Sequence, residues 1–388
     1  MSSGLVTSRR NRRTPYTDRV EVQGVSGFSI VNHTLLPKSF ARSVEEDYWH
    51  LKEHVQLWDV GCQRQVELRG PDAAFLAQQM TPRDLRSMAV GQCYYTPLID
   101  NHAGLLNDPV LLKRDCDWFW FSIADSDVLL WAKALALGMN LDVEVCEPDV
   151  WPLAVQGPRA EELVARVFGD EVRSVPYFSF IERDFHGRRL AVARSGYSKQ
   201  GGFEVYLDDS TLGTKLWDTL WDAGADLEVA PGCPNLIERI EAGLLSYGNE
   251  MTRENNPLEI NLDRFCHLDG EIEYIGRSAL VKISAEGPNQ RMRGLLIDGE
   301  RCPPCANPWP VCVEGVKVGQ VTSAIWSPAF GKNVGLSLIS KAHWTAGTPV
   351  KVAMPGGVIS DAVIVTLPFD NGRGKNIMDQ KNSGLVGP

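Results

Sequence analysis

The chain has 388 residues, of which 44% are hydrophobic and 23% charged, so it can bury more than one core and should fold as two or three domains. Its 39 basic and 49 acidic residues give a formal net charge of −10, which disfavours nucleic acid and an anionic membrane surface as partners. Nine scattered cysteines, an odd number, favour reduced thiols and a cytoplasmic location over a disulfide framework.

The N-terminal region contains a basic run and then an amphipathic pattern. Arg9 to Arg13 are not followed by an apolar stretch, so they predict a solvated arm or a domain-docking segment, and neither a signal peptide nor a membrane anchor. Residues 43–58 predict a helix packed against a core, because Ser43 and Glu46 fit a capping box. The apolar residues at helical spacing are Tyr48, Leu51, Val55 and Trp58.

One pattern occurs twice in the first half of the chain. Residues 65–76 and residues 152–163 each predict a strand, a Gly-Pro pair and then a helix. Proline in the first helical turn costs no hydrogen bond, and the preceding glycine permits a sharp exit from the strand. This weak internal repeat predicts two related βα units and hence related subdomains.

Three further elements are expected before the C-terminal region. The aromatic-rich residues 117–124 predict a strand. Residues 126–139 predict a helix, and because its apolar side chains run nearly all round, we expect it to be buried. A helix over residues 235–248 is indicated by Asn235 at its start and Gly248 at its end.

From about Pro288 the pattern changes to short β runs. The predicted strands are residues 292–298, 311–314, 317–326, 334–339, 349–354 and 359–369. Their close spacing predicts a small barrel or sandwich. The residues after Asp370 contain too few apolar side chains to fold, so we expect a disordered tail. Cys302 and Cys305 have CxxC spacing without a second pair, and no metal site is predicted.

Polar residues beside glycines and aromatics concentrate in three segments, residues 93–110, 194–206 and 236–251. No GxxxxGK[ST], GxGxxG or GxSxG motif accompanies them, which lowers the expectation of ATP, NAD or serine-hydrolase chemistry. Asp108 and Glu204 each enter an apolar strand, where an unpaired carboxylate is costly. From periodicity alone, each acid could equally cap a turn or pair with an arginine, and Arg239 could pair with an acid of its own helix.

The same segments resemble a known superfamily. SGYSKQGGFEVY and, at residues 237–251, IERIEAGLLSYGNEM resemble the TGYTGEDGFE and LRLEAG patterns of the aminomethyltransferase (glycine-cleavage T-protein) superfamily. IDNHAGLLNDPVLLK resembles the strand–turn–strand of that superfamily that ends in its catalytic aspartate. Within the superfamily, the dimethylsulfoniopropionate demethylases match more closely. RRTPYTDRVEVQGVS, NHTLLP, HLKEHVQLWDV and GCPNLIERIEAGLLSYGNE extend this likeness over residues 12–250, and it continues more weakly to residue 369.

The resemblance implies an α+β fold, a three-domain T-protein-like cloverleaf with antiparallel sheets, helices and a small C-terminal β-barrel around a folate channel. The implied parts are a discontinuous folate-binding domain (1–62 and 150–285), a second α+β domain (63–149), the barrel (286–370) and the tail (371–388). The implied reaction moves a methyl group from a sulfonium donor to tetrahydrofolate, the co-substrate, and yields a thioether and 5-methyltetrahydrofolate. The implied partners are the small-molecule donor and folate, and a homodimer is expected from base rates alone.

The resemblance also implies roles for individual residues. Asp108 would be catalytic and lie near N5 of the folate, Glu204 would bind the pterin, and Arg239 and Tyr247 would support that site. The residues expected to contact the methyl donor are Tyr95, Tyr197, Phe203, Tyr206 and Lys199. Aromatic faces can hold an onium cation, but ordinary packing is the alternative for most of these rings.

Two positions depart from the demethylase pattern, which has Trp and Tyr where this chain has Tyr197 and Phe203. The methyl donor therefore stays open between dimethylsulfoniopropionate and another onium or methoxy compound. Two other functions also stay open: aminomethyl transfer in glycine cleavage, and a non-catalytic folate-binding module. Residues 198–200 replace the loop of the aminomethyltransferases and count against the first, whereas Asp108 counts against the second.

Overall fold

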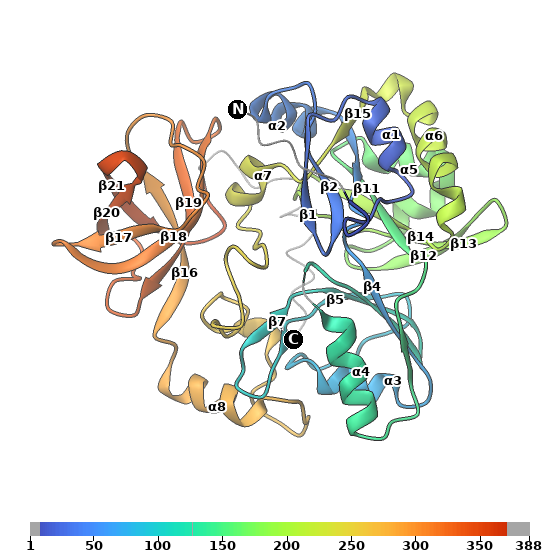
Figure 1. Ribbon diagram of the computed structural model, residues 1–388, viewed down its shortest axis with the longest axis horizontal. Helices are drawn as coiled ribbons and strands as arrows, with labels where there is room; N and C mark the ends of the chain where they lie inside the picture. Colours follow the sequence, from blue (N-terminus) through green and yellow to red (C-terminus); the bar gives the residue numbers. More distant parts are fainter. Residues whose placement is uncertain (1–7, 126, 371–388) are drawn as a thin grey trace.

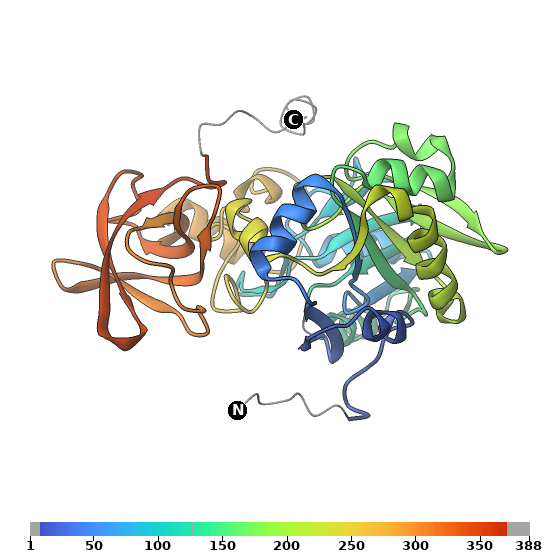
Figure 2. The ribbon, with the colours of Figure 1, turned by 90° about the horizontal axis from the view of Figure 1, so that it is seen from above.

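The structure, a computed structural model, describes residues 8–125 and 127–370. Two α+β units lie side by side and a closed β-barrel lies to one side of them, with long loops between the three parts (Figure 1). Seen from above, the barrel occupies one end of the molecule and the two units occupy the other (Figure 2). The expected α+β class and the C-terminal barrel are confirmed. The expected tail, residues 371–388, lies outside the described residues.

The first unit is built on a six-stranded sheet in the order β12-β13-β14-β11-β3-β15. Its strands are β3 (Val55–Asp59), β11 (Trp151–Gln156), β12 (Phe180–Phe185), β13 (Arg188–Ala193), β14 (Gly202–Leu207) and β15 (Val229–Gly232). All neighbours are antiparallel except β3 and β15, which are parallel. The helices α1 (Thr17–Val22), α5 (Ala160–Phe168) and α6 (Gly213–Ala223) pack on one face of this sheet (Figure 1).

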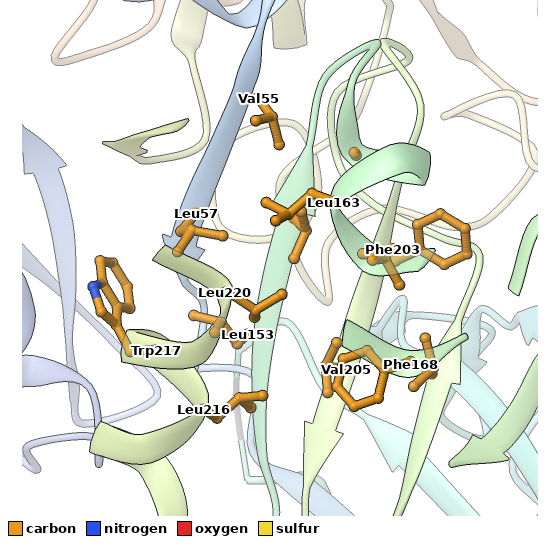
Figure 3. Close-up of a cluster of buried hydrophobic side chains, with 14 of the residues drawn as sticks. Val55, Leu57, Leu153, Leu163, Phe168, Phe203, Val205, Leu216, Trp217 and Leu220 are labelled. Atoms are coloured by element: carbon orange, nitrogen blue, oxygen red, sulfur yellow. The ribbon is translucent and has the colours of Figure 1, made fainter. Parts of the chain in front are cut away.

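That face carries the largest apolar core. Side chains alternate along each strand, so Phe203, Val205 and Leu207 of β14 point toward the helices, while Glu204 and Tyr206 point to the opposite face. Figure 3 shows Phe203 and Val205 among side chains of the neighbouring strands and of the two long helices. The sheet therefore presents Glu204 toward the second unit.

The second unit repeats the layering. Its five-stranded antiparallel sheet has the order β10-β4-β9-β8-β5. The strands are β4 (Gln65–Arg69), β5 (Cys93–Tyr95), β8 (Val110–Asp115), β9 (Trp118–Ser122) and β10 (Glu144–Cys146), and the helices are α3 (Ala73–Gln79) and α4 (Val128–Gly138). The helices cover the outer face, and Leu112 and Trp120 pack from the inner face against Ala191 and Tyr206 of the first sheet. The predicted βα pattern is present in both units, as β4–α3 and β11–α5.

The barrel closes in the order β16-β19-β18-β17-β20-β21. Its strands are β16 (Gln290–Ile297), β17 (Trp309–Val313), β18 (Val316–Ser327), β19 (Lys332–Ser340), β20 (Pro349–Met354) and β21 (Val358–Val365), close to the six predicted runs. The remaining elements are β1 (Gly27–Val31), β2 (Thr34–Ser39), α2 (Val44–Glu53), β6 (Leu98–Ile99), β7 (Leu105–Asn107), α7 (Leu236–Glu241) and α8 (Arg277–Glu286). A mixed core joins the barrel to β6, β7 and α8 through Met292, Leu336 and Leu280.

Three helix predictions need correction. The helix predicted over residues 43–58 ends at Glu53, and Val55 and Trp58 belong to β3, because an apolar run of both elements fits helical spacing by chance. The helix predicted to end at Gly248 ends at Glu241, because Gly243 takes a left-handed φ of 67°. The helix predicted to be buried is α4, which exposes Leu137 to 84%.

The capping box at the start of α2 predicts a measurable contribution to stability. Glu46 N donates to Ser43 Oγ at 3.2 Å, and Ser43 N donates to Glu46 Oε2 at 2.7 Å. Ser43→Ala removes one of these bonds and should lower the free energy of unfolding by about 1 kcal/mol in a urea titration. Ser43→Asp, which restores an acceptor at the cap, should recover most of that loss, and equal stabilities of all three proteins would contradict the assignment.

Candidate active site

Asp108 lies in the connection between β7 and β8, not inside a strand as the sequence suggested. It is 7% exposed, and the Tyr95 hydroxyl donates to its Oδ2 at 2.6 Å. Its Oδ1 is buried and has no hydrogen-bond partner among the described residues. Burial raises the pKa of Asp108 to about 7, against the opposing effect of the Tyr95 hydrogen bond. The site therefore offers an acceptor oxygen that can exchange a proton near neutral pH.

Glu204 lies in β14, directly opposite Ala154 of β11 and Ala193 of β13. These two small neighbours leave room above the sheet for the carboxylate. Ser195 Oγ donates to Glu204 Oε2 at 2.5 Å, and the side chain is buried. Burial raises the pKa of Glu204, and the hydrogen bond from Ser195 acts in the opposite direction. Glu204 is thus a second buried acid, and the side chains of Ser195 and Gln63 interact with it.

Arg239 lies in α7 and is buried, but its partner is not an acid of its own helix. Its Nη1 donates to Glu250 Oε2 at 2.7 Å and its Nη2 donates to Ser323 Oγ of β18 at 2.7 Å. Glu250 also accepts from the Ser246 amide at 2.8 Å and from the Thr322 hydroxyl at 3.2 Å. The ion pair therefore joins the segment after α7 to the barrel.

Three tyrosines, Tyr95, Tyr197 and Tyr247, belong to the same part of the structure as Asp108 and Arg239. The Tyr95 hydroxyl bonds to Asp108, the Tyr197 hydroxyl donates to Leu245 O at 2.5 Å, and the Tyr247 hydroxyl donates to Leu105 O at 3.1 Å. Burial raises the pKa of all three phenols, and the negative charge of Asp108 acts in the same direction on each. Tyr95 contacts Asp108 itself, and Tyr247 contacts the backbone three residues before it. All three phenols stay protonated at neutral pH.

Two residues predicted to contact a methyl donor lie elsewhere. Phe203 is 1% exposed in the helix-covered core of the first unit (Figure 3), because it points away from Glu204 on the same strand. Tyr206 is fully buried between the two sheets, with its ring 6.3 Å from that of Trp120. Lys199 is exposed in the loop before β14, with a φ of 52°. Phe203 and Tyr206 are therefore core residues.

The sequence analysis missed Glu250 and Ser195 as partners of the predicted residues. Both lie within the segments singled out for their polar composition, at residues 236–251 and 194–206. Glu250 is 1% exposed in the structure. The signal available in the sequence was an acid 11 residues after the candidate arginine, within the same polar segment. Cys302 and Cys305 are free thiols whose pKa burial raises to about 11, so both stay protonated at neutral pH.

The site contains three buried acids, Asp108, Glu204 and Glu250, and within the described part of the chain Asp108 Oδ1 has no hydrogen-bond partner. Glu250 contacts Thr322 of the barrel, whereas Glu204 belongs to the sheet of the first unit. Two α+β units and a closed barrel make up a three-part fold that is also found in an aminomethyltransferase. The glycine cleavage system aminomethyltransferase T from Bartonella henselae has the same fold, with a TM-score of 0.82, 22% identity and coverage of 94% of this chain and 99% of that one. In the described residues, no helix combines the length and the apolarity needed to cross a membrane.

The family follows from two models that together cover most of the chain. The GCVT N-terminal domain matches residues 16–270, and the glycine cleavage T-protein C-terminal barrel domain matches residues 290–370. The chain therefore belongs to the glycine cleavage T-protein family, and the resemblance predicted from its motifs is confirmed.

Among its relatives, the dimethylsulfoniopropionate demethylase of Ruegeria pomeroyi is 51% identical over 356 residues, which are 92% of this chain and 97% of the relative. An aminomethyltransferase of Symbiobacterium thermophilum is 30% identical, over 84% of this chain and 89% of the relative. The likeness to the demethylase is therefore the stronger of the two and spans nearly all of both chains.

Proposed function

We propose that this protein is a tetrahydrofolate-dependent demethylase that transfers a methyl group from the sulfonium of dimethylsulfoniopropionate to tetrahydrofolate. The observation that carries the proposal is the 51% identity to a dimethylsulfoniopropionate demethylase along nearly the whole of both chains. The reaction breaks one S–CH3 bond and forms one N5–CH3 bond. The sulfur keeps the electron pair and becomes a thioether, and N5 of the folate loses its proton.

The buried polar groups fit a reduced pterin. Such a ring presents N–H donors, and Asp108 Oδ1 is a buried acceptor that lacks a partner among the described residues. Glu204 is a second buried carboxylate, suited to accept paired N–H bonds from the aminopyrimidinone edge. Arg239 and Tyr247 would support this site, Arg239 through Glu250 and Tyr247 through its bond to Leu105.

The side chains then have separate tasks. Tetrahydrofolate supplies the nucleophilic nitrogen. Asp108, with its pKa raised to about 7, is suited to accept the N5 proton through Oδ1, while Tyr95 holds Oδ2 and fixes the direction of the carboxylate. A sulfonium already leaves as a neutral thioether, so no general acid is needed. Alignment of the two reactants can supply about 7–11 kcal/mol of the barrier reduction in well-oriented systems.

The donor side fits a cation. Tyr95 and Tyr197 present aromatic rings close to Asp108, and an onium over such a ring gains about 0.5–2 kcal/mol. The rings remain neutral phenols because their pKa values are raised by burial. Lys199, in the loop before β14, is the remaining proposed donor contact.

The test is an assay of the purified protein with tetrahydrofolate and a panel of sulfonium, quaternary-ammonium and methoxy donors, in which the folate product is identified by mass. We expect 5-methyltetrahydrofolate from dimethylsulfoniopropionate. Methylenetetrahydrofolate formed with an aminomethylated lipoyl carrier protein would point to glycine cleavage instead. Folate binding without turnover of any donor would point to a binding module.

The proposal also covers the domain boundaries, the cellular location and the oligomeric state. The domain boundaries are those implied by the family resemblance, with residues 1–62 and 150–285 forming one domain, 63–149 the second and 286–370 the barrel. The location is cytoplasmic, in keeping with nine free thiols among the described residues. The protein is a homodimer, which size-exclusion chromatography with light scattering would test.

A further inference from the structure

Two arginines lie over the same aromatic ring beside the candidate site. Arg83 follows α3, and Arg264 precedes Phe265 in the short helix η4 (Asp263–Phe265). Their guanidinium carbons are 4.9 and 4.6 Å from the centroid of the Phe265 ring. The His267 amide donates to Pro82 O at 2.8 Å, which ties the two loops together. The two positive charges are therefore held near each other.

These charges lack the acids that compensate other arginines of this chain. Several buried or half-buried arginines elsewhere pair with carboxylates, as in Arg64–Glu147, Arg114–Glu182 and Arg239–Glu250, whereas half-buried Arg293 donates to carbonyl and amide oxygens. Among the described residues, neither Arg83 nor Arg264 forms an ion pair. Two close, uncompensated cations in a chain of net charge −10 favour an anion from outside the protein.

The environment of Arg83 also favours the binding of an anion. Burial lowers the pKa of Arg83 to about 10, and the positive charge of Arg264 acts in the same direction. Its Nη1 donates to Tyr95 O at 2.7 Å, and its guanidinium stacks on the Tyr94 ring at 3.8 Å. These contacts fix the position of the side chain without neutralising its charge. A bound anion would do so.

The pair adjoins the residues around both candidate acids. The Tyr95 ring, whose hydroxyl bonds to Asp108, meets Phe265 edge to face at 5.3 Å. Burial raises the pKa of Tyr177 to about 12, where the charge of Glu204 adds to the effect and that of Arg264 opposes it. Arg264 is thus close to Tyr95, which contacts Asp108, and to Tyr177, whose pKa the charge of Glu204 also raises. Its side chain is exposed, so an anion can reach it from solvent.

We propose that Arg83 and Arg264 bind a carboxylate of a reactant. The inference rests on the proposed function, in which each reactant carries such a group: the glutamate of tetrahydrofolate, and the propionate of dimethylsulfoniopropionate. A planar guanidinium binds a carboxylate through two parallel N–H···O bonds, and a second guanidinium nearby strengthens the attraction. Arg264 receives the anion at the surface, and Arg83 holds it from the half-buried side.

The test compares Arg264→Glu with the unmodified protein and with a control variant, Lys282→Glu. The control makes the same change of charge on the surface of α8. KM is measured for tetrahydrofolate, for 6-methyltetrahydropterin, which lacks the aminobenzoyl-glutamate, and for dimethylsulfoniopropionate. Arg264→Glu should raise KM by about tenfold for one carboxylate-bearing reactant, and Arg264→Lys by much less. The pterin lacks the carboxylate, so its KM should not change, and Lys282→Glu should behave as the unmodified protein.

The outcomes separate the sources and the hypotheses. A rise confined to tetrahydrofolate assigns the carboxylate to its glutamate, and a rise confined to the sulfonium donor assigns it to the propionate. Unchanged KM values for both, in a protein that turns over, would overturn the carboxylate subsite and leave the proposed function standing. If the unmodified protein binds no folate in calorimetry, the proposed function fails first and the subsite fails with it.

Discussion

Replacing Asp108 by Asn should lower kcat by about 10²–10⁴-fold while folate still binds. An amide can accept a hydrogen bond from the pterin, but it cannot take the N5 proton. Asp108 is the group best placed to do so, because its buried Oδ1 has no partner among the described residues and its pKa is raised to about 7. Single-turnover formation of 5-methyltetrahydrofolate and calorimetry with folate measure the two effects separately.

A matched control lies on the next strand. Asp115 ends β8, is exposed and carries no role in the proposed reaction, so Asp115→Asn should leave kcat unchanged. If Asp108→Asn kept at least a tenth of the activity, proton transfer to Asp108 would not be needed. If the variant lost folate binding altogether, Asp108 would act in binding and not in the chemical step.

The dependence of kcat/KM on pH is an independent test of Asp108 as the base. A base must be deprotonated, so kcat/KM should rise from pH 6 to pH 8 with a midpoint near 7, the value to which burial raises the pKa of Asp108. The Tyr95 hydroxyl lowers that pKa by donating to Oδ2, so Tyr95→Phe should move the midpoint upward. A flat profile in the unmodified protein would contradict the role of Asp108.

Much of the fold was predictable because local chemistry determined it. The Ser43–Glu46 capping box and the Asn235 cap satisfy backbone N–H groups at the starts of α2 and α7. These caps, and the Gly-Pro pairs just before α3 and α5, appear where expected. The six C-terminal strands were also found, because short β runs with turns between them form a periodic signal over the whole barrel.

The errors occurred where tertiary context decides. Val55 and Trp58 continue the helical spacing of α2, and only the pairing of β3 with β11 and β15 makes them strand residues. The sequence cannot report that Leu137 of α4 faces solvent, since its composition is that of a buried helix.

Individual residues of the site were predictable from the sequence, but their neighbours in the fold were not. The positions of Asp108 and Glu204 came from motif resemblance, and both side chains are buried as a ligand-binding acid requires. Alternation along β14 would have separated Glu204 from Phe203, but a period of two cannot say which face meets the second unit. Arg83 and Arg264 are far apart in sequence, so only the fold reveals them as neighbours of one ring.

Breaking the buried pair Arg239–Glu250, which contacts the barrel through Ser323 and Thr322, should cause a large loss of stability. Glu250→Gln keeps the shape of the side chain but leaves Arg239 buried without a carboxylate, and Arg239 is only 6% exposed. Breaking a buried ion pair in this way costs about 3–5 kcal/mol. The variant should therefore show a clearly lower unfolding midpoint in differential scanning calorimetry.

Two further variants separate the loss of the pair from other effects. Glu254→Gln changes an exposed acid four residues away and should not shift the midpoint. A double replacement of Arg239 and Glu250 by Met removes both charges, and because an apolar pair of similar volume avoids the desolvation penalty, it should recover much of the stability. If Glu250→Gln were as stable as the unmodified protein, the charge of Glu250 would contribute nothing to holding Arg239 against Ser323 of the barrel, and the attachment would rest on apolar contacts such as Met292 and Leu336.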